Sequence, residues 1–132
     1  MQIFMFLLAM GFAFAATAED AGGLSYFYCI HAEQSCKVTA GEVPVKNGNA
    51  SLVARRVLST KDDFVGFVDA RQTTLQFFVE DIDSILVDMP FPKQKGSFST
   101  HMNRAQALSL IGRLSPPLAR YRTELKLEFG KW

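Results

Sequence analysis

The residues best suited to chemistry in this sequence are the two histidines and the serines near one of them. His101 follows Ser97 and Ser99, so Ser99, His101 and an upstream acid could supply a nucleophile, a base and an orienting group. No nucleophile-elbow pattern surrounds either serine. Serines beside a histidine just before a helix are more often loop residues at the helix start, so we predict no catalytic residue and no enzyme.

Four acids, Glu80, Asp81, Asp83 and Asp88, lie close together in the sequence. Paired carboxylates could act as general acid and base, and clustered oxygens could bind calcium. The calcium-loop spacing is absent, however, and aspartate is favoured at hairpin turns for its turn geometry alone. A solvated turn and a charged docking surface are the main alternatives for these acids.

Metal and cofactor sites have little support. His31, Met89, His101 and Met102 carry groups that bind copper, but they do not cluster in the sequence, and methionine commonly fills hydrophobic cores. The sequence lacks a glycine-rich phosphate loop and a basic stripe with interleaved aromatic residues. We predict no metal, no cofactor and no nucleic-acid partner.

Charge is unevenly distributed along the chain, although the formal net charge is only +1. From Asp62 to Asp88 there are seven acids and one base, whereas from Lys93 to Lys131 there are eight bases and two acids. These charges either pair in the fold or leave an acidic face and a basic face.

The start of the chain has the pattern of a signal peptide. Residues 3–16 are almost wholly apolar, and Ala16, Thr17 and Ala18 form a small-x-small cleavage site. The run is too short to cross a bilayer of about 30 Å as a helix. We expect residues 1–18 to be cleaved and residues 19–132 to form one domain, periplasmic or secreted, without a membrane span; the alternative is a buried N-terminal helix.

Cys29 and Cys36 are expected to form a disulfide, because an even, closely spaced pair in an exported chain favours one. A structural zinc site needs four ligands, and only His31 stands near. The spacing also differs from that of a redox-active Cys-x-x-Cys pair. In the chain-entropy model a loop this short contributes roughly 2.5 kcal/mol.

The positions of these residues depend on elements that the sequence also predicts. Strands are expected over residues 25–31, 52–58, 73–80, 84–89 and 121–129, with a short strand opening at Cys36. Residues 61–71 fit the helical and the strand period, and we favour a helix because Asp62 and Asp63 would face the positive end of its dipole. Residues 91–100 are expected to form a loop.

A helix is predicted to follow Asn103, with Gln106 completing a capping box. Its expected apolar stripe is Ala107, Leu108, Ile111 and Leu114. Strands and helices without strict alternation predict an α+β fold, an antiparallel β-sheet of about five strands with one or two helices packed on one side.

A small exported domain without catalytic motifs indicates a protein that works by binding. We expect an inhibitor or immunity protein that blocks a protein partner, such as a secreted toxin or enzyme; the alternatives are an accessory subunit of a cell-envelope complex and a small hydrolase with an unrecognised site. A turn exposes its side chains, and prolines stiffen the loop that follows. The predicted partner-binding residues are Asp81, Asp83, Phe91, Lys93, Lys95 and Phe98.

Export is directly testable. N-terminal sequencing of the periplasmic or extracellular form should begin at Glu19, because cleavage is expected after Ala18. Recovery of only the full-length chain, confined to the cytoplasm, would contradict this expectation.

Overall fold

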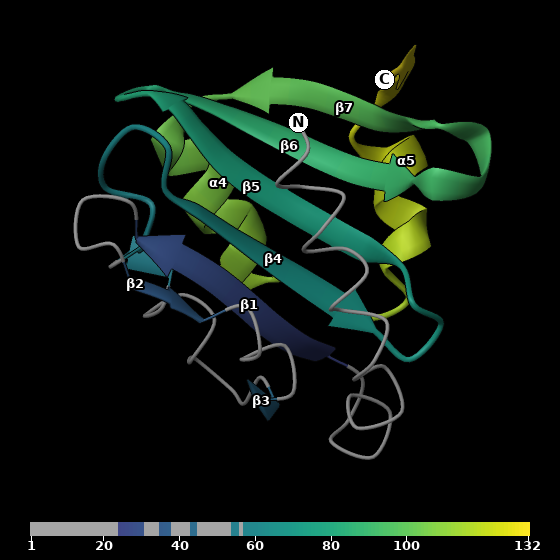
Figure 1. The fold of residues 1–132 in the computed structure, drawn as a ribbon, viewed down its shortest axis with the longest axis horizontal. Coiled ribbons are helices and arrows are strands. Elements are labelled where there is room, and N and C mark those ends of the chain that lie inside the picture. The colour runs from purple at the N-terminus through teal and green to yellow at the C-terminus, as the bar shows by residue number, and fades with distance from the viewer. Residues whose placement is uncertain (1–23, 31–34, 38–42, 45–53, 56) are drawn as a thin grey trace.

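The computed structural model describes residues 24–30, 35–37, 43–44, 54–55 and 57–132 (Figure 1). Within them, eight strands form one antiparallel sheet in the order β2-β1-β4-β5-β6-β7-β8, with β3 also paired to β1. The strands are β1 (Leu24–Ile30), β2 (Ser35–Lys37), β3 (Val43–Pro44), β4 (Phe64–Asp69), β5 (Thr74–Asp81), β6 (Ser84–Phe91), β7 (Gly96–Met102) and β8 (Glu128–Lys131).

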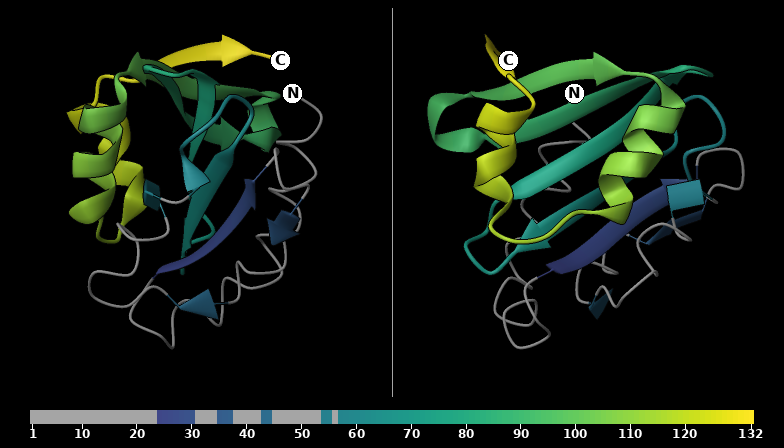
Figure 2. Two further views of the ribbon diagram at one scale, coloured as in Figure 1. Left: turned by 90° about the vertical axis from the view of Figure 1, so that its left-hand side faces the viewer. Right: turned by 180° about the vertical axis from the view of Figure 1, so that it is seen from behind.

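The helices lie on one face of this sheet (Figure 2). They are α4 (Arg104–Gly112) and α5 (Tyr121–Glu124), and short 3-10 turns η3 (Pro92–Gln94) and η4 (Leu118–Arg120) stand before β7 and α5. The main core fills the space between the sheet and the helices. The predicted α+β class, with helices on one side, is confirmed; the sheet has more strands than the five expected.

The β5–β6 hairpin follows the expected pattern. Alternate residues of both strands are apolar, which is typical of strands with one face in the core. The resulting buried set is Leu75, Phe77, Val79, Ile85, Val87 and Met89. The turn falls between Asp81 and Ser84, where the sequence predicted it.

The helix favoured for residues 61–71 is wrong, because Phe64–Asp69 form the inner strand β4. All six residues are buried, and β4 pairs with both β1 and β5, so the segment satisfies its backbone on two sides. The acids that suggested a helix start have another role: the Asp63 carboxylate accepts hydrogen bonds from the Thr60 amide and hydroxyl, each at 2.9 Å.

Three further assignments are corrected. The strand expected over residues 52–58 is helical where it is described, since the Leu58 amide donates to the Ala54 carbonyl. The loop expected over residues 91–100 contains the first five of the seven residues of β7, which pairs with β6 and β8. The strand expected over residues 121–129 begins as α5, and only Glu128–Lys131 extend, because Tyr121 turns into the core.

The predicted helix after Asn103 is confirmed. The Asn103 side chain accepts from the Gln106 amide and the Gln106 side chain accepts from the Asn103 amide, which forms the capping box. The buried residues of α4 are Ala107, Leu110 and Ile111, and Leu108 is only half-buried. The apolar stripe is therefore rotated from the predicted one, toward Leu110.

Asp69 links the end of β4 to the C-terminal helices. One carboxylate oxygen accepts from the Arg71 and Thr73 amides, each at 3.0 Å, and the other accepts from the Leu118 amide at 2.8 Å. Asp69 is 1% exposed, so these three donors replace the water that its carboxylate loses.

The register of β1 and β2 places Cys36 directly opposite Cys29. The backbone arrangement suits the expected disulfide, which stays a prediction. The expected signal peptide, residues 1–18, lies outside the described residues. In the described part of the chain, every helix is too short or too polar to cross a membrane.

Gly66 is required by packing. It stands opposite Phe27, and a β-carbon at Gly66 would overlap the Phe27 ring. Gly66→Ala should lower the free energy of unfolding by about 1–3 kcal/mol, as overpacking does. Gly130→Ala is the control, because a β-carbon there meets nothing within 4 Å and should cost under about 0.5 kcal/mol. Urea unfolding measures both; equal effects would contradict the packing role.

Candidate binding surfaces

The six predicted binding residues do not form one surface. Asp81 and Asp83 lie at the β5–β6 turn, whereas Phe91, Lys93, Lys95 and Phe98 lie at or beside the opposite end of β6. Strands rise about 3.4 Å per residue, so the length of β6 separates the two groups by roughly 24 Å. Each group has to be judged as a separate site.

The acidic turn is largely used by the fold. Asp81 Oδ1 accepts from the Ile82 amide at 2.8 Å, and Asp83 Oδ1 accepts from the Arg104 amide at 3.3 Å at the start of α4. Glu80 pairs with His101 at 2.6 Å across the sheet. These contacts favour a structural role for the turn, although Ile82 at its tip is 76% exposed.

The other group belongs to an aromatic cluster. The Phe98 ring contacts Phe91 and Phe129 edge-to-face, with both pairs of ring centroids 5.2 Å apart. The Arg122 guanidinium lies over Phe98, 4.8 Å from the ring centroid. Phe91 and Phe98 are half-buried against the main core, but Phe129 is 41% exposed. The cluster thus joins the core to the surface.

The connection between β6 and β7 holds this cluster in place. Pro92 opens η3, and Lys95 closes it in the left-handed region with φ 51°. At Gly96 a β-carbon would lie 2.6 Å from the Phe129 ring, so the glycine lets β8 approach. The Trp132 amide donates to the Lys95 carbonyl at 2.9 Å, which ties the residue after β8 to this connection.

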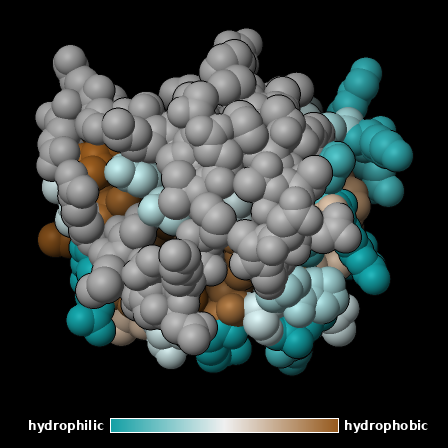
Figure 3. Space-filling model, turned by 90° about the horizontal axis from the view of Figure 1, so that it is seen from below, coloured by the Kyte–Doolittle hydropathy of each residue, from teal (hydrophilic) through white to brown (hydrophobic). Residues whose placement is uncertain are grey.

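Basic side chains surround the cluster. We define the basic aromatic surface as Phe91, Lys93, Lys95, Phe98, Arg122, Phe129, Lys131 and Trp132; all four of its basic residues are exposed. The acids on neighbouring elements are fewer: Glu124 pairs with Arg120 at 3.5 Å, and Glu128 stands on β8. Seen from below, the molecule carries hydrophilic residues at its right-hand edge, with others at the lower left and bottom (Figure 3).

Half of this surface was absent from the predicted site. Arg122, Phe129, Lys131 and Trp132 were not included, because residues 121–129 were taken as one strand with a solvated outer face. The excess of bases from Lys93 to Lys131 was the signal that could have indicated a basic surface.

A buried polar group lies on the sheet face that carries Phe27. Asp88 is 6% exposed and stands opposite Gln76 and Ser99 in the register. The Gln76 amide nitrogen donates to Asp88 Oδ2 at 3.5 Å, while Gln76 Oε1 has no hydrogen-bond partner. Burial raises the pKa of the Asp88 carboxyl, and hydrogen bonds from Ser97 and Gln76 oppose that rise.

Catalytic geometry is incomplete in the described residues. Glu80 contacts His101 Nε2, as an orienting acid would, but no hydrogen bond joins Ser99 to His101 in this part of the chain. The described residues also hold no group of three or more His, Cys, Asp or Glu side chains suited to a metal ion.

No protein-family model, curated protein or solved structure matches this chain.

The buried Asp88 makes stability depend on pH. The pKa of the Asp88 carboxyl is raised in the folded state, so folding favours its protonated form. The stability that this form contributes is fully present below the pKa of the unfolded chain. It is lost as pH rises through the pKa of the folded protein. In Asp88→Asn this loss is absent. Urea unfolding from about pH 4 to about pH 7 should show the variant gaining stability relative to wild type as pH rises. A difference independent of pH would contradict the assignment.

Proposed function

We propose that this chain is an exported protein-binding protein of the inhibitor or immunity type, which blocks an acidic partner protein through its basic aromatic surface. The observation that carries the proposal is the Phe91–Phe98–Phe129 cluster, whose outer ring is exposed among four basic side chains. Aromatic and arginine residues dominate the binding energy of many interfaces, and surrounding charges accelerate encounter with an oppositely charged partner.

The stiffness of the surface adds to its suitability. Phe98 is fixed by its two aromatic neighbours and by Arg122, and the Trp132 amide is bound to Lys95. A surface that is already ordered loses little conformational entropy when it docks. Inhibitors that block a site benefit from this, because more of the contact energy remains as affinity.

The acidic turn is the competing surface, and cross-linking separates the two. A photoreactive phenylalanine analogue is placed at Phe129 in one variant and at Ile82 in another, since both side chains are exposed. In the source cells, the variant changed at Phe129 should give a discrete cross-linked protein and the variant changed at Ile82 should not. Cross-linking from Ile82 alone would assign binding to the acidic turn and defeat the proposal.

Charge reversal tests the role of the basic residues. Lys93→Glu with Lys95→Glu should weaken binding to the cross-linked partner about tenfold or more at low salt, because two attractive charges become repulsive. Arg55→Glu with Lys61→Glu is the matched control, since these exposed residues lie outside the surface. The wild-type domain should also inhibit the purified partner's activity. Binding without inhibition would leave a binding protein but remove the inhibitor assignment.

A further inference from the structure

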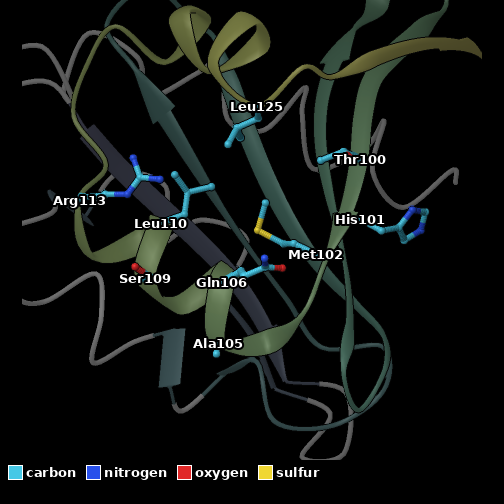
Figure 4. A pocket seen from close by; sticks show the side chains of 9 residues that line it. All are labelled: Thr100, His101, Met102, Ala105, Gln106, Ser109, Leu110, Arg113 and Leu125. Carbon is cyan, nitrogen blue, oxygen red and sulfur yellow. The ribbon is translucent and has the colours of Figure 1, made fainter.

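A second surface lies beside the basic aromatic one, in a groove between α4 and β7 (Figure 4). The groove has a volume of about 530 Å³. Met102 and Leu125 supply apolar surface above the buried Leu110, and Thr100, Gln106 and Arg113 add polar groups. These residues come from three separate elements, so the groove is built by the tertiary fold.

The groove runs along an edge of the sheet that β8 leaves partly unpaired. β8 pairs with β7 only over Gly96–Ser99. Residues 100–102 of β7 pair with β6 on one side but have no strand on the other among the described residues. An unpaired strand edge presents backbone donors and acceptors that an added strand can use.

The side chains of residues 100 and 102, on the unpaired edge of β7, point into the groove. Phe98 packs toward the helices, so Thr100 and Met102, at intervals of two, point to the same side, and both line the groove. The side chains of a strand added along residues 100–102 would likewise point alternately toward the groove and away from it. Every second side chain of that strand would enter the groove beside Leu110 and Leu125.

Charge identifies the kind of peptide that fits. The Arg113 side chain is exposed at the groove and has no ion pair among the described residues. No acid lines the groove, and Lys126 directly follows Leu125 in the sequence. An acidic side chain or a terminal carboxylate on the bound peptide would meet unpaired positive charge.

We propose that this groove binds an extended acidic peptide segment of a partner protein, which adds a strand along residues 100–102 of β7 and places apolar side chains in the groove between α4 and β7. The site does not depend on the basic aromatic surface, because its lining residues are different. It gives the protein a second mode of recognition, based on backbone pairing.

The test uses a displayed library of random eight-residue peptides selected against the full protein. Selected peptides should alternate apolar and other residues and carry acids. Ser109→Trp, which fills the groove from an exposed position, should abolish their binding, whereas Ala119→Trp, exposed on η4, should leave it intact. Arg113→Glu should weaken binding about tenfold, and Lys93→Glu with Lys95→Glu should not change it.

Backbone pairing has its own signature. N-methylation of alternate amides of a selected synthetic peptide removes the donors on one edge, so one of the two alternate patterns should abolish binding and the other should preserve it. Equal effects of both patterns, or peptides insensitive to Ser109→Trp, would overturn the proposal. Failure to select peptides above background would overturn it too. A dimer of this chain that Ser109→Trp dissociates would also overturn it, because a second copy would then occupy the groove.

Discussion

The burial of β4 is the constraint on which the rest of the structure depends. Its six residues are covered on both faces and paired on both edges, so the strand has no freedom to shift. Gly66 fits there because the Phe27 ring lies across it. At the end of the strand, the Asp69 carboxylate accepts hydrogen bonds from the Thr73 amide in the following turn and from the Leu118 amide. The bond to Leu118 positions the C-terminal helices against the sheet. Both proposed binding surfaces include residues from this C-terminal part.

The acidic stretch and the basic stretch of the sequence differ in how far their charged side chains are buried. Among the acids from Asp62 to Asp88, Asp63, Asp69 and Asp88 are buried and hydrogen-bonded within the fold. The bases from Lys93 onward remain mostly exposed, and several gather around Phe129. Three of the seven carboxylates in this stretch are therefore removed from the surface, because carboxylates are efficient hydrogen-bond acceptors within a fold.

Local patterns predicted the hairpin, the capped helix and the α+β class because each depends on contacts between residues close in sequence. The Asn103–Gln106 capping box is an example. Residues 61–71 fitted both periods and were assigned wrongly because the two acids were taken as a helix start, whereas Asp63 bonds Thr60 in the turn before β4, and the pairing of β4 on both edges is not visible in the local sequence. The basic aromatic surface was only half predicted, since Phe129 and Trp132 reach Gly96 and Lys95 through a strand pairing that the sequence does not encode locally.

The Asp69–Leu118 hydrogen bond also has a kinetic consequence. It joins residues 49 positions apart, and Asp69 has its other two amide partners within the same turn. Closing so long a loop costs chain entropy, so contacts of this separation slow folding. We expect the β4–β5 turn to form early and the η4 segment to dock late, so that Leu125 completes the groove beside α4 only after β4 and β5 have paired.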